Sequence, residues 1–260
     1  MSPRAGAMNT VAASVALILL AGCSILKPAP PPDTPDDARR LIASITRQNN
    51  ELDRFKGMGT AYMSRRDGGR QTARVAWIAD TPDKLRLSVL DIAGLPLATM
   101  AADGEHFFMA AHAPKKKYFK TRAANPSLKK MIDVDVRARE IIAVLGGRVP
   151  MREWDHARVE ADAGTGDPVL VLNSRRGRVV ERIHLSGDLK TVRSVEMFDA
   201  SGRRMYTWTF SRLQELEGGF SVPFDIDISD GEAHLRLKIR RFWPDAAAAP
   251  STFSLSESEI

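Results

Sequence analysis

The later part of the chain alternates apolar and polar residues with a period of two, and this pattern restricts the fold more than any other feature. In the segment 222–228 every second residue is Val, Phe or Ile, and the residues between them are Pro or Asp. The segment 234–240 alternates in the same way, and 178–185 does so at most positions. Strands with one apolar and one polar face are typical of antiparallel sheets, and the short turns between them favour a meander.

About eleven strand-like segments follow one another, interrupted once by a helical region, and a sheet of that size tends to curl. Helical patterns near 36–55 and 126–146 each offer one apolar stripe to cover the sheet. Because so few short helices do not fill so wide a space, we expect an apolar cavity beneath them. The predicted fold class is α+β, mostly β: a curled antiparallel sheet with a helical lid over an apolar cavity. The residues expected to line this cavity are Val75, Trp77, Leu85, Leu87, Val89, Val222, Phe224, Ile226, Leu235 and Leu237.

The N-terminus has the order of an export signal. Arg4 is the only charged residue before Cys23, and an apolar run from residue 11 to residue 20 is too short to span a bilayer. The sequence Leu-Ala-Gly-Cys at 20–23 resembles the lipobox of bacterial lipoproteins. This resemblance implies that residues 1–22 are removed and that Cys23, the only cysteine, carries acyl chains. The alternative is an ordinary signal peptide with a chance cysteine. Ser24 after the cysteine indicates, by the same resemblance, the outer membrane.

Three further segments complete the predicted organisation. Residues 23–35 contain five prolines, which favour a stiff tether rather than a folded element. Residues 36–243 hold all the periodic segments and are expected to form one domain. Residues 244–260 are rich in Ala, Pro and Ser, and we expect a flexible tail.

Motifs for catalysis or cofactor binding are not found in the sequence. The five histidines are far apart, no second cysteine could complete a usual zinc site, and no phosphate-binding glycine loop occurs. The net charge of +6 permits an anionic partner, but the basic residues are widely spread. We therefore expect that the protein is not an enzyme and that it binds no metal, cofactor or nucleic acid. We also expect a monomer. The basic cluster at 115–120 fits either a charged edge strand or contact with lipid headgroups.

The segment 91–97 is an unusual turn, because tight turns are generally polar. Here Ile92, Leu95 and Leu97 surround Gly94 between two predicted strands. One interpretation places these side chains in the core. The other exposes them as an apolar tip that dips into a membrane.

The order of motifs along the chain resembles LolB, the family of outer-membrane lipoproteins that accept other lipoproteins from a periplasmic carrier and insert them. The resemblance begins with the lipobox and the proline-rich tether and covers most of the mature chain. Its motifs are RFKGMGTAYM at 54–63, the strands and loop at 73–100, the helix pair at 125–147 and LRLKIRRFWPD at 235–245. The resemblance implies an antiparallel half-barrel of about eleven strands, a helical lid and a cavity that accepts acyl chains.

The resemblance also implies a membrane-insertion loop, here Ile92, Ala93, Gly94 and Leu95. In the family a leucine precedes the glycine, whereas this chain has Ala93, so Ile92 or Leu95 would have to take its role. The implied partners are a LolA-like periplasmic carrier, acylated client lipoproteins, and membrane lipid reached through Cys23 on the periplasmic face of the outer membrane. Two alternatives remain: an anchored protein of the same fold that binds another lipid or scaffolds outer-membrane assembly, and an anchored hydrolase.

Overall fold

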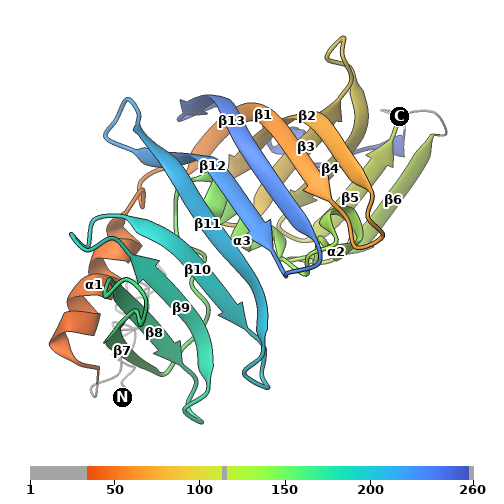
Figure 1. Cartoon of the computed structure of the whole chain (residues 1–260). Helices are drawn as coiled ribbons and strands as arrows, with labels where there is room; N and C mark the ends of the chain where they lie inside the picture. The colour runs from red at the N-terminus through yellow and green to blue at the C-terminus, as the bar shows by residue number, and fades with distance from the viewer. Residues whose placement is uncertain (1–33, 113–115, 258–260) are drawn as a thin grey trace, which may run out of the picture. The chain divides into compact units, whose positions relative to one another are not determined.

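The computed structural model describes residues 34–112 and 116–257, and within them thirteen strands form one antiparallel sheet (Figure 1). The spatial order is β6-β5-β4-β3-β2-β1-β13-β12-β11-β10-β9-β8-β7. The strands are β1 (Arg54–Ser64), β2 (Arg70–Asp80), β3 (Lys84–Leu90), β4 (Pro96–Asp103), β5 (His106–Ala111), β6 (Lys117–Arg122), β7 (His156–Ala161), β8 (Pro168–Asn173), β9 (Val179–Leu185), β10 (Val192–Phe198), β11 (Arg204–Glu215), β12 (Ser221–Ser229) and β13 (His234–Pro244).

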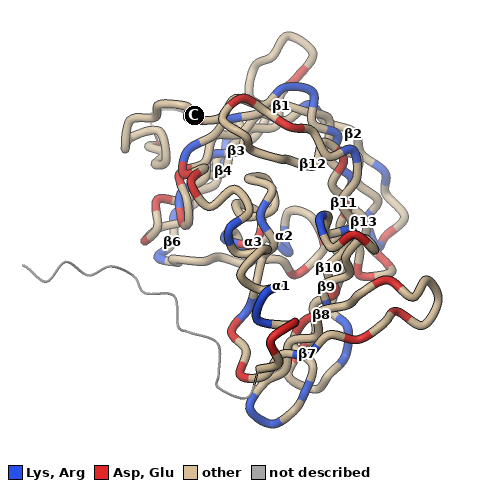
Figure 2. The backbone as a smooth tube through the Cα atoms, turned by 90° about the vertical axis from the view of Figure 1, so that its left-hand side faces the viewer, with Lys and Arg blue, Asp and Glu red and all other residues tan. Residues whose placement is uncertain are grey.

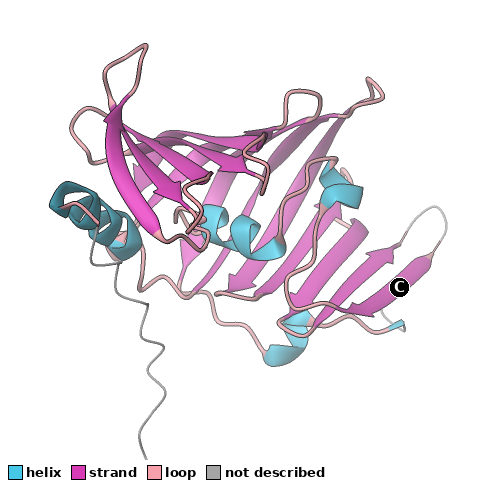
Figure 3. Ribbon diagram, turned by 90° about the horizontal axis from the view of Figure 1, so that it is seen from below, coloured by secondary structure: helices cyan, strands magenta, loops and turns pink. Residues whose placement is uncertain are grey.

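The sheet is open, because β6 and β7 are its two edges and are not paired with each other. The pairing of β1 with β13 joins the two meanders into one layer. Figure 3 shows this layer as the main body of the fold, with few helical segments beside it. The helices are α1 (Asp36–Arg47), α2 (Lys129–Ile132) and α3 (Ala138–Leu145), and a short 3-10 helix, η1 (Pro250–Phe253), follows β13. In Figure 2 the strands curve around α2 and α3.

The antiparallel, mostly β architecture predicted from the alternation is confirmed, but the expected number of about eleven strands is too low. The alternation is missing from two of the observed strands, β4 and β6. Positions 99–102 of β4 are buried on both faces, so this strand does not alternate. The edge strand β6 has mainly charged and exposed residues and lacks an apolar face.

The helix pair predicted at 126–146 is confirmed as α2 and α3, whereas the first helix is shorter than its predicted range of 36–55. It ends at Arg47, and Asn49 follows with a φ of 52°, in the left-handed region that interrupts a helix. The apolar residues Leu52 and Phe55 are completely buried, but Phe55 already belongs to β1. Their helical spacing therefore reflects burial in the core rather than continuation of the helix.

The last described residues are packed on the sheet, in contrast to the flexible tail expected at 244–260. Phe253 and Leu255 are buried, and Leu255 packs with Phe108 on the outer face of β4 and β5. The Tyr118 hydroxyl donates a hydrogen bond of 2.8 Å to the Leu255 carbonyl. Two isolated apolar residues in a polar segment gave no periodicity from which this packing could be predicted.

Cys23, the signal segment 1–22 and most of the tether 23–35 lie outside the described residues. Among the helices that the structure describes, none is long and apolar enough to cross a membrane.

Candidate functional site

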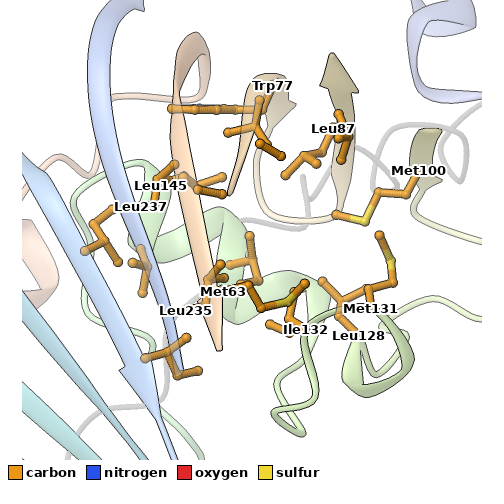
Figure 4. Close-up of a pocket in the computed structure, with 18 of the residues that line it drawn as sticks. Met63, Trp77, Leu87, Met100, Leu128, Met131, Ile132, Leu145, Leu235 and Leu237 are labelled. Carbon is orange, nitrogen blue, oxygen red and sulfur yellow. The ribbon is translucent and has the colours of Figure 1, made fainter. Parts of the chain in front are cut away.

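An apolar pocket of about 200 Å³ lies between the inner face of the sheet and the α2–α3 region (Figure 4). Of the described residues that line it, all have predominantly apolar side chains except Gln71. A ligand in such a pocket would bind through the apolar area it removes from water rather than through hydrogen bonds. The helical side is formed by Leu128, Met131, Ile132, Ile141, Val144 and Leu145.

Seven of the ten predicted lining residues face this pocket: Val75, Trp77, Leu87, Val89, Ile226, Leu235 and Leu237. The other three, Leu85, Val222 and Phe224, are buried in the core and do not line it. They lie toward the opposite end of their strands, and at that end Val222 packs against Gly147, just after α3. The alternation predicts which face of the sheet a residue occupies. It does not predict which part of each strand is filled by α3 and which part faces the pocket.

Seven lining residues on the strands were not among the predicted set, although they have the inward orientation that the alternation implies. They are Ala61, Met63, Gln71, Ala73, Met100, Trp208 and Ile228. Met63 and Ala61 are separated by one residue on β1, and Ile228 is the next inward position after Ile226. The available signal was therefore the same period of two, extended by one or two positions toward the strand ends.

The pocket extends toward the end of the sheet where β1 turns into β2. Met63 is paired with Gln71 on β2 and with Leu235 on β13. These three residues are partly or fully exposed, whereas Trp77 and Leu145 at the other end of the pocket are buried. A ligand would therefore reach the pocket from the β1–β2 end.

The shape of the inner end depends on a glycine that lies under an aromatic ring. Gly57 on β1 is the cross-strand neighbour of Trp77, and a Cβ atom at this position would lie 2.3 Å from Cζ2 of the indole. Only a residue without a side chain lets the ring lie this close to the sheet.

The turn between β3 and β4 has an apolar and exposed tip. The Asp91 carboxylate accepts a hydrogen bond of 2.8 Å from the backbone N–H of Leu95, and Gly94 adopts a φ of 90°. Ile92 is 97% exposed, Leu95 is 65% exposed, and Ala93 is exposed as well. The interpretation in which these residues belong to the core is therefore wrong.

This apolar turn lies at the same end of the sheet as the exposed end of the pocket. Leu90, just before the turn, is paired with Arg74, and β2 begins only four residues earlier at Arg70, opposite the end of β1. Arg74 donates a hydrogen bond of 3.0 Å from its guanidinium to the Ile92 carbonyl. The fold thus places an exposed apolar tip beside the accessible end of an apolar pocket.

A buried polar network fixes α3 against the second half of the sheet. The guanidinium of Arg152 contacts the Glu140 carboxylate on α3 at 3.2 Å and the Tyr206 hydroxyl on β11 at 2.8 Å. Tyr206 donates a hydrogen bond of 2.6 Å to Glu140. Glu181 on β9 is completely buried and accepts a hydrogen bond of 3.0 Å from the Arg152 backbone N–H.

Glu140 already balances the charge of Arg152, so the second buried carboxyl has no cation of its own. Burial raises the pKa of Glu181 to about 8, with the Glu140 carboxylate adding to the effect and Arg152 opposing it. Sequence analysis did not identify this network, because its four residues come from four segments with no shared spacing.

The histidines His184 and His234 lie at or near the surface. His184 lies near Asp162 and Glu196, and His234 is 2.7 Å from Asp227. No group of three His, Cys, Asp or Glu residues in the described segments is arranged to hold a metal ion. The described part of the basic cluster 115–120 begins the edge strand β6, as its interpretation as a charged edge requires.

No protein-family model matches the chain, and its sequence matches no curated protein. Its fold, in contrast, is similar to that of solved structures. A LolA superfamily protein from Nitrosomonas europaea is 12% identical, with a TM-score of 0.58 over 84% of this chain and 97% of that one. A putative outer membrane lipoprotein-sorting protein domain from Vibrio parahaemolyticus is 9% identical, with a TM-score of 0.44 over 83% and 94%. The first similarity confirms the fold that the sequence resemblance implied: the chain has a LolA/LolB-like fold.

Proposed function

We propose that this protein is a lipid-anchored receptor that binds the acyl chains of client lipoproteins and inserts them into the outer membrane without covalent chemistry. The observation that carries the proposal is the placement of the exposed apolar turn, with Ile92 and Leu95, at the accessible end of the apolar pocket. A protein that only stores a lipid needs the pocket, whereas one that delivers it to a bilayer also needs a surface that enters the bilayer.

The chemistry of the pocket suits a hydrocarbon chain. Its walls offer no charge, and binding would draw on roughly 25 cal/mol for each Å² of apolar surface removed from water. The volume of about 200 Å³ is below the roughly 300–1,000 Å³ of typical ligand sites, so we propose that α2 forms a lid that moves when a chain enters, while the Arg152 network holds α3 in place. Asp133, just after α2, contacts Arg65 in the β1–β2 turn at 3.2 Å, which would hold the lid closed in the absence of a ligand.

The turn would provide the contact with the bilayer. Ile92 and Leu95 can each contribute about 1.5–3 kcal/mol when fully buried in an apolar environment. Both side chains are already in water, so their insertion breaks no contact with the core. They would take the role that the family assigns to the position of Ala93.

The anchor and the partners complete the proposal. Acylation of Cys23 after removal of residues 1–22 would hold the protein at the periplasmic face of the outer membrane, with residues 23–35 as a tether. More than one acyl chain is needed for stable anchoring. The client would arrive on a LolA-like periplasmic carrier and leave into the same membrane, and the receptor would act as a monomer.

The test separates uptake from delivery. The full acylated protein is reconstituted in liposomes and incubated with an acylated lipoprotein on its carrier, and client bound to the receptor and client inserted in the bilayer are measured separately. Replacing Ile92 and Leu95 by Glu should abolish insertion and leave uptake intact. The matched control is Leu189→Glu, since Leu189 is 48% exposed in the β9–β10 turn at the opposite end of the sheet.

Two results would contradict the proposal. Equal insertion by the Ile92 and Leu95 double variant would exclude the turn as the inserting element. Absence of any uptake, together with purification of the protein with a different lipid in the pocket, would instead favour a protein of the same fold that binds another lipid.

A further inference from the structure

The hairpin turns at the two ends of the sheet differ in charge. Register places five described turns at the end that carries Ile92, namely residues 65–69, 91–95, 174–178, 199–203 and 230–233, and it places His112 and Lys116 at the same end. These residues include seven Lys or Arg and five Asp or Glu. The five hairpin turns at the opposite end, 81–83, 104–105, 162–167, 186–191 and 216–220, include one Lys and six Asp or Glu. The sheet therefore has a basic end and an acidic end.

Cations lie on both sides of the apolar turn. On one side are Arg70 and Arg74 at the start of β2. On the other side lies Lys117, at the start of β6. Lys117 is paired with Ala111 on β5, and Ala111 is paired with Ala98, which follows the apolar turn on β4. In the described segments neither Arg70 nor Lys117 has a carboxylate within ion-pair distance, and both are exposed. Their charges therefore face solvent beside the apolar tip.

The negative charge of Asp91, within the turn, is less exposed to solvent than the positive charges of Arg70 and Lys117. Asp91 is only partly exposed, and its carboxylate accepts the backbone hydrogen bond of Leu95. The Arg74 guanidinium is directed to the Ile92 carbonyl, so one positive charge is held at the base of the tip. An apolar tip with cations on either side matches a bilayer with anionic headgroups, which has hydrocarbon inside and negative charge at its surface.

We propose that the basic end of the sheet docks on anionic phospholipid headgroups, and that this attraction orients the turn for insertion. The proposal rests on the proposed function and adds the chemistry of the membrane surface that the protein recognises. The acidic opposite end is repelled by the same surface, so the two ends act together to set the orientation. Because exposed charges are screened over roughly 10 Å at 0.1 M salt, docking should weaken as the salt concentration rises.

The experiment uses the full acylated protein anchored in liposomes. Cys23 is the only cysteine of the chain, so Ala93→Cys provides the one free thiol once Cys23 is acylated. An environment-sensitive fluorophore on this thiol reports insertion of the turn in vesicles of phosphatidylcholine alone or mixed with phosphatidylglycerol. We expect insertion to be stronger with phosphatidylglycerol and to be reduced by salt.

Charge reversals test the residues themselves. Arg70→Glu or Lys117→Glu should reduce insertion into the anionic vesicles about tenfold, the size expected when one or two cations leave an anionic surface. Lys190→Glu, the same charge change at the opposite end, should have no such effect. Equal insertion in both kinds of vesicle, or an equal loss from Lys190→Glu, would overturn the charge proposal while leaving insertion of the turn intact. No insertion in either vesicle would overturn the inserting turn as well.

Discussion

Replacing Glu181 by Gln should stabilise the protein at neutral and alkaline pH and change its stability little at about pH 5. In the unfolded chain this carboxyl loses its proton near its ordinary pKa of 4.5, whereas burial in the folded protein raises the pKa to about 8. Between these values unfolding releases a proton, so stability falls as the pH rises. The loss is about 1.4 kcal/mol for each pH unit, or roughly 3–5 kcal/mol across the window. A neutral Gln can still accept the Arg152 N–H and removes this loss.

The assay is denaturant unfolding of the wild type and the variant across the range from about pH 5 to about pH 9. Glu215→Gln on the exposed part of β11 is the matched control and should follow the wild type. The free energy difference between Glu181→Gln and the wild type should grow as the pH rises and level off above about pH 8. A constant difference, or one that grows toward acid pH, would refute the assignment of Glu181 as a neutral buried acid.

Three further substitutions test packing contacts in different parts of the fold. Asn49→Ala should lower the free energy of unfolding by about 2–4 kcal/mol. The Asn49 side-chain amide donates a hydrogen bond of 2.7 Å to the Ser221 carbonyl and accepts one of 3.0 Å from the Ser221 N–H, and the variant loses both. An unchanged denaturant midpoint would show that these bonds do not stabilise the fold. Gly57→Ala should shift Trp77 and lower the melting temperature, and unchanged Trp fluorescence would show that the ring is not held as described. Leu255→Asp should expose the apolar residues Ala101, Phe108 and Ala110 on the outer face of the sheet and increase the binding of an apolar dye. Unchanged dye binding would mean that the C-terminal segment does not cover these residues.

The period of two was sufficient to predict the sheet, its antiparallel pairing and the inward face of most pocket residues. It failed where a strand is covered on both sides. Ala101 in β4 is buried by Leu255, a residue more than 150 positions later, and no local pattern carries that information. The extent of the pocket could not be predicted for the same reason, since only the final position of α3 decides that Val222 packs against Gly147 whereas Ile226 lines the pocket.

The candidate site was predicted in its parts but not in its arrangement. The apolar residues of the turn 91–97 were visible in the sequence, and their two interpretations differed only in exposure. The structure decides between them because Asp91 satisfies the backbone of the turn locally, which leaves Ile92 in solvent. The polar network around Glu181 joins four distant segments, so it could not be inferred before the strands were placed.

Quenching of individual tryptophans by a brominated acyl chain tests the central claim most directly. Trp77 lines the pocket, whereas Trp243 is exposed near the end of β13. Two variants that each retain only one of these tryptophans are mixed with a diacylated lipopeptide whose acyl chains carry bromine. Strong quenching of Trp77 with little quenching of Trp243 is the result we predict. Equal quenching of both, or of Trp243 alone, would contradict binding of acyl chains in the pocket.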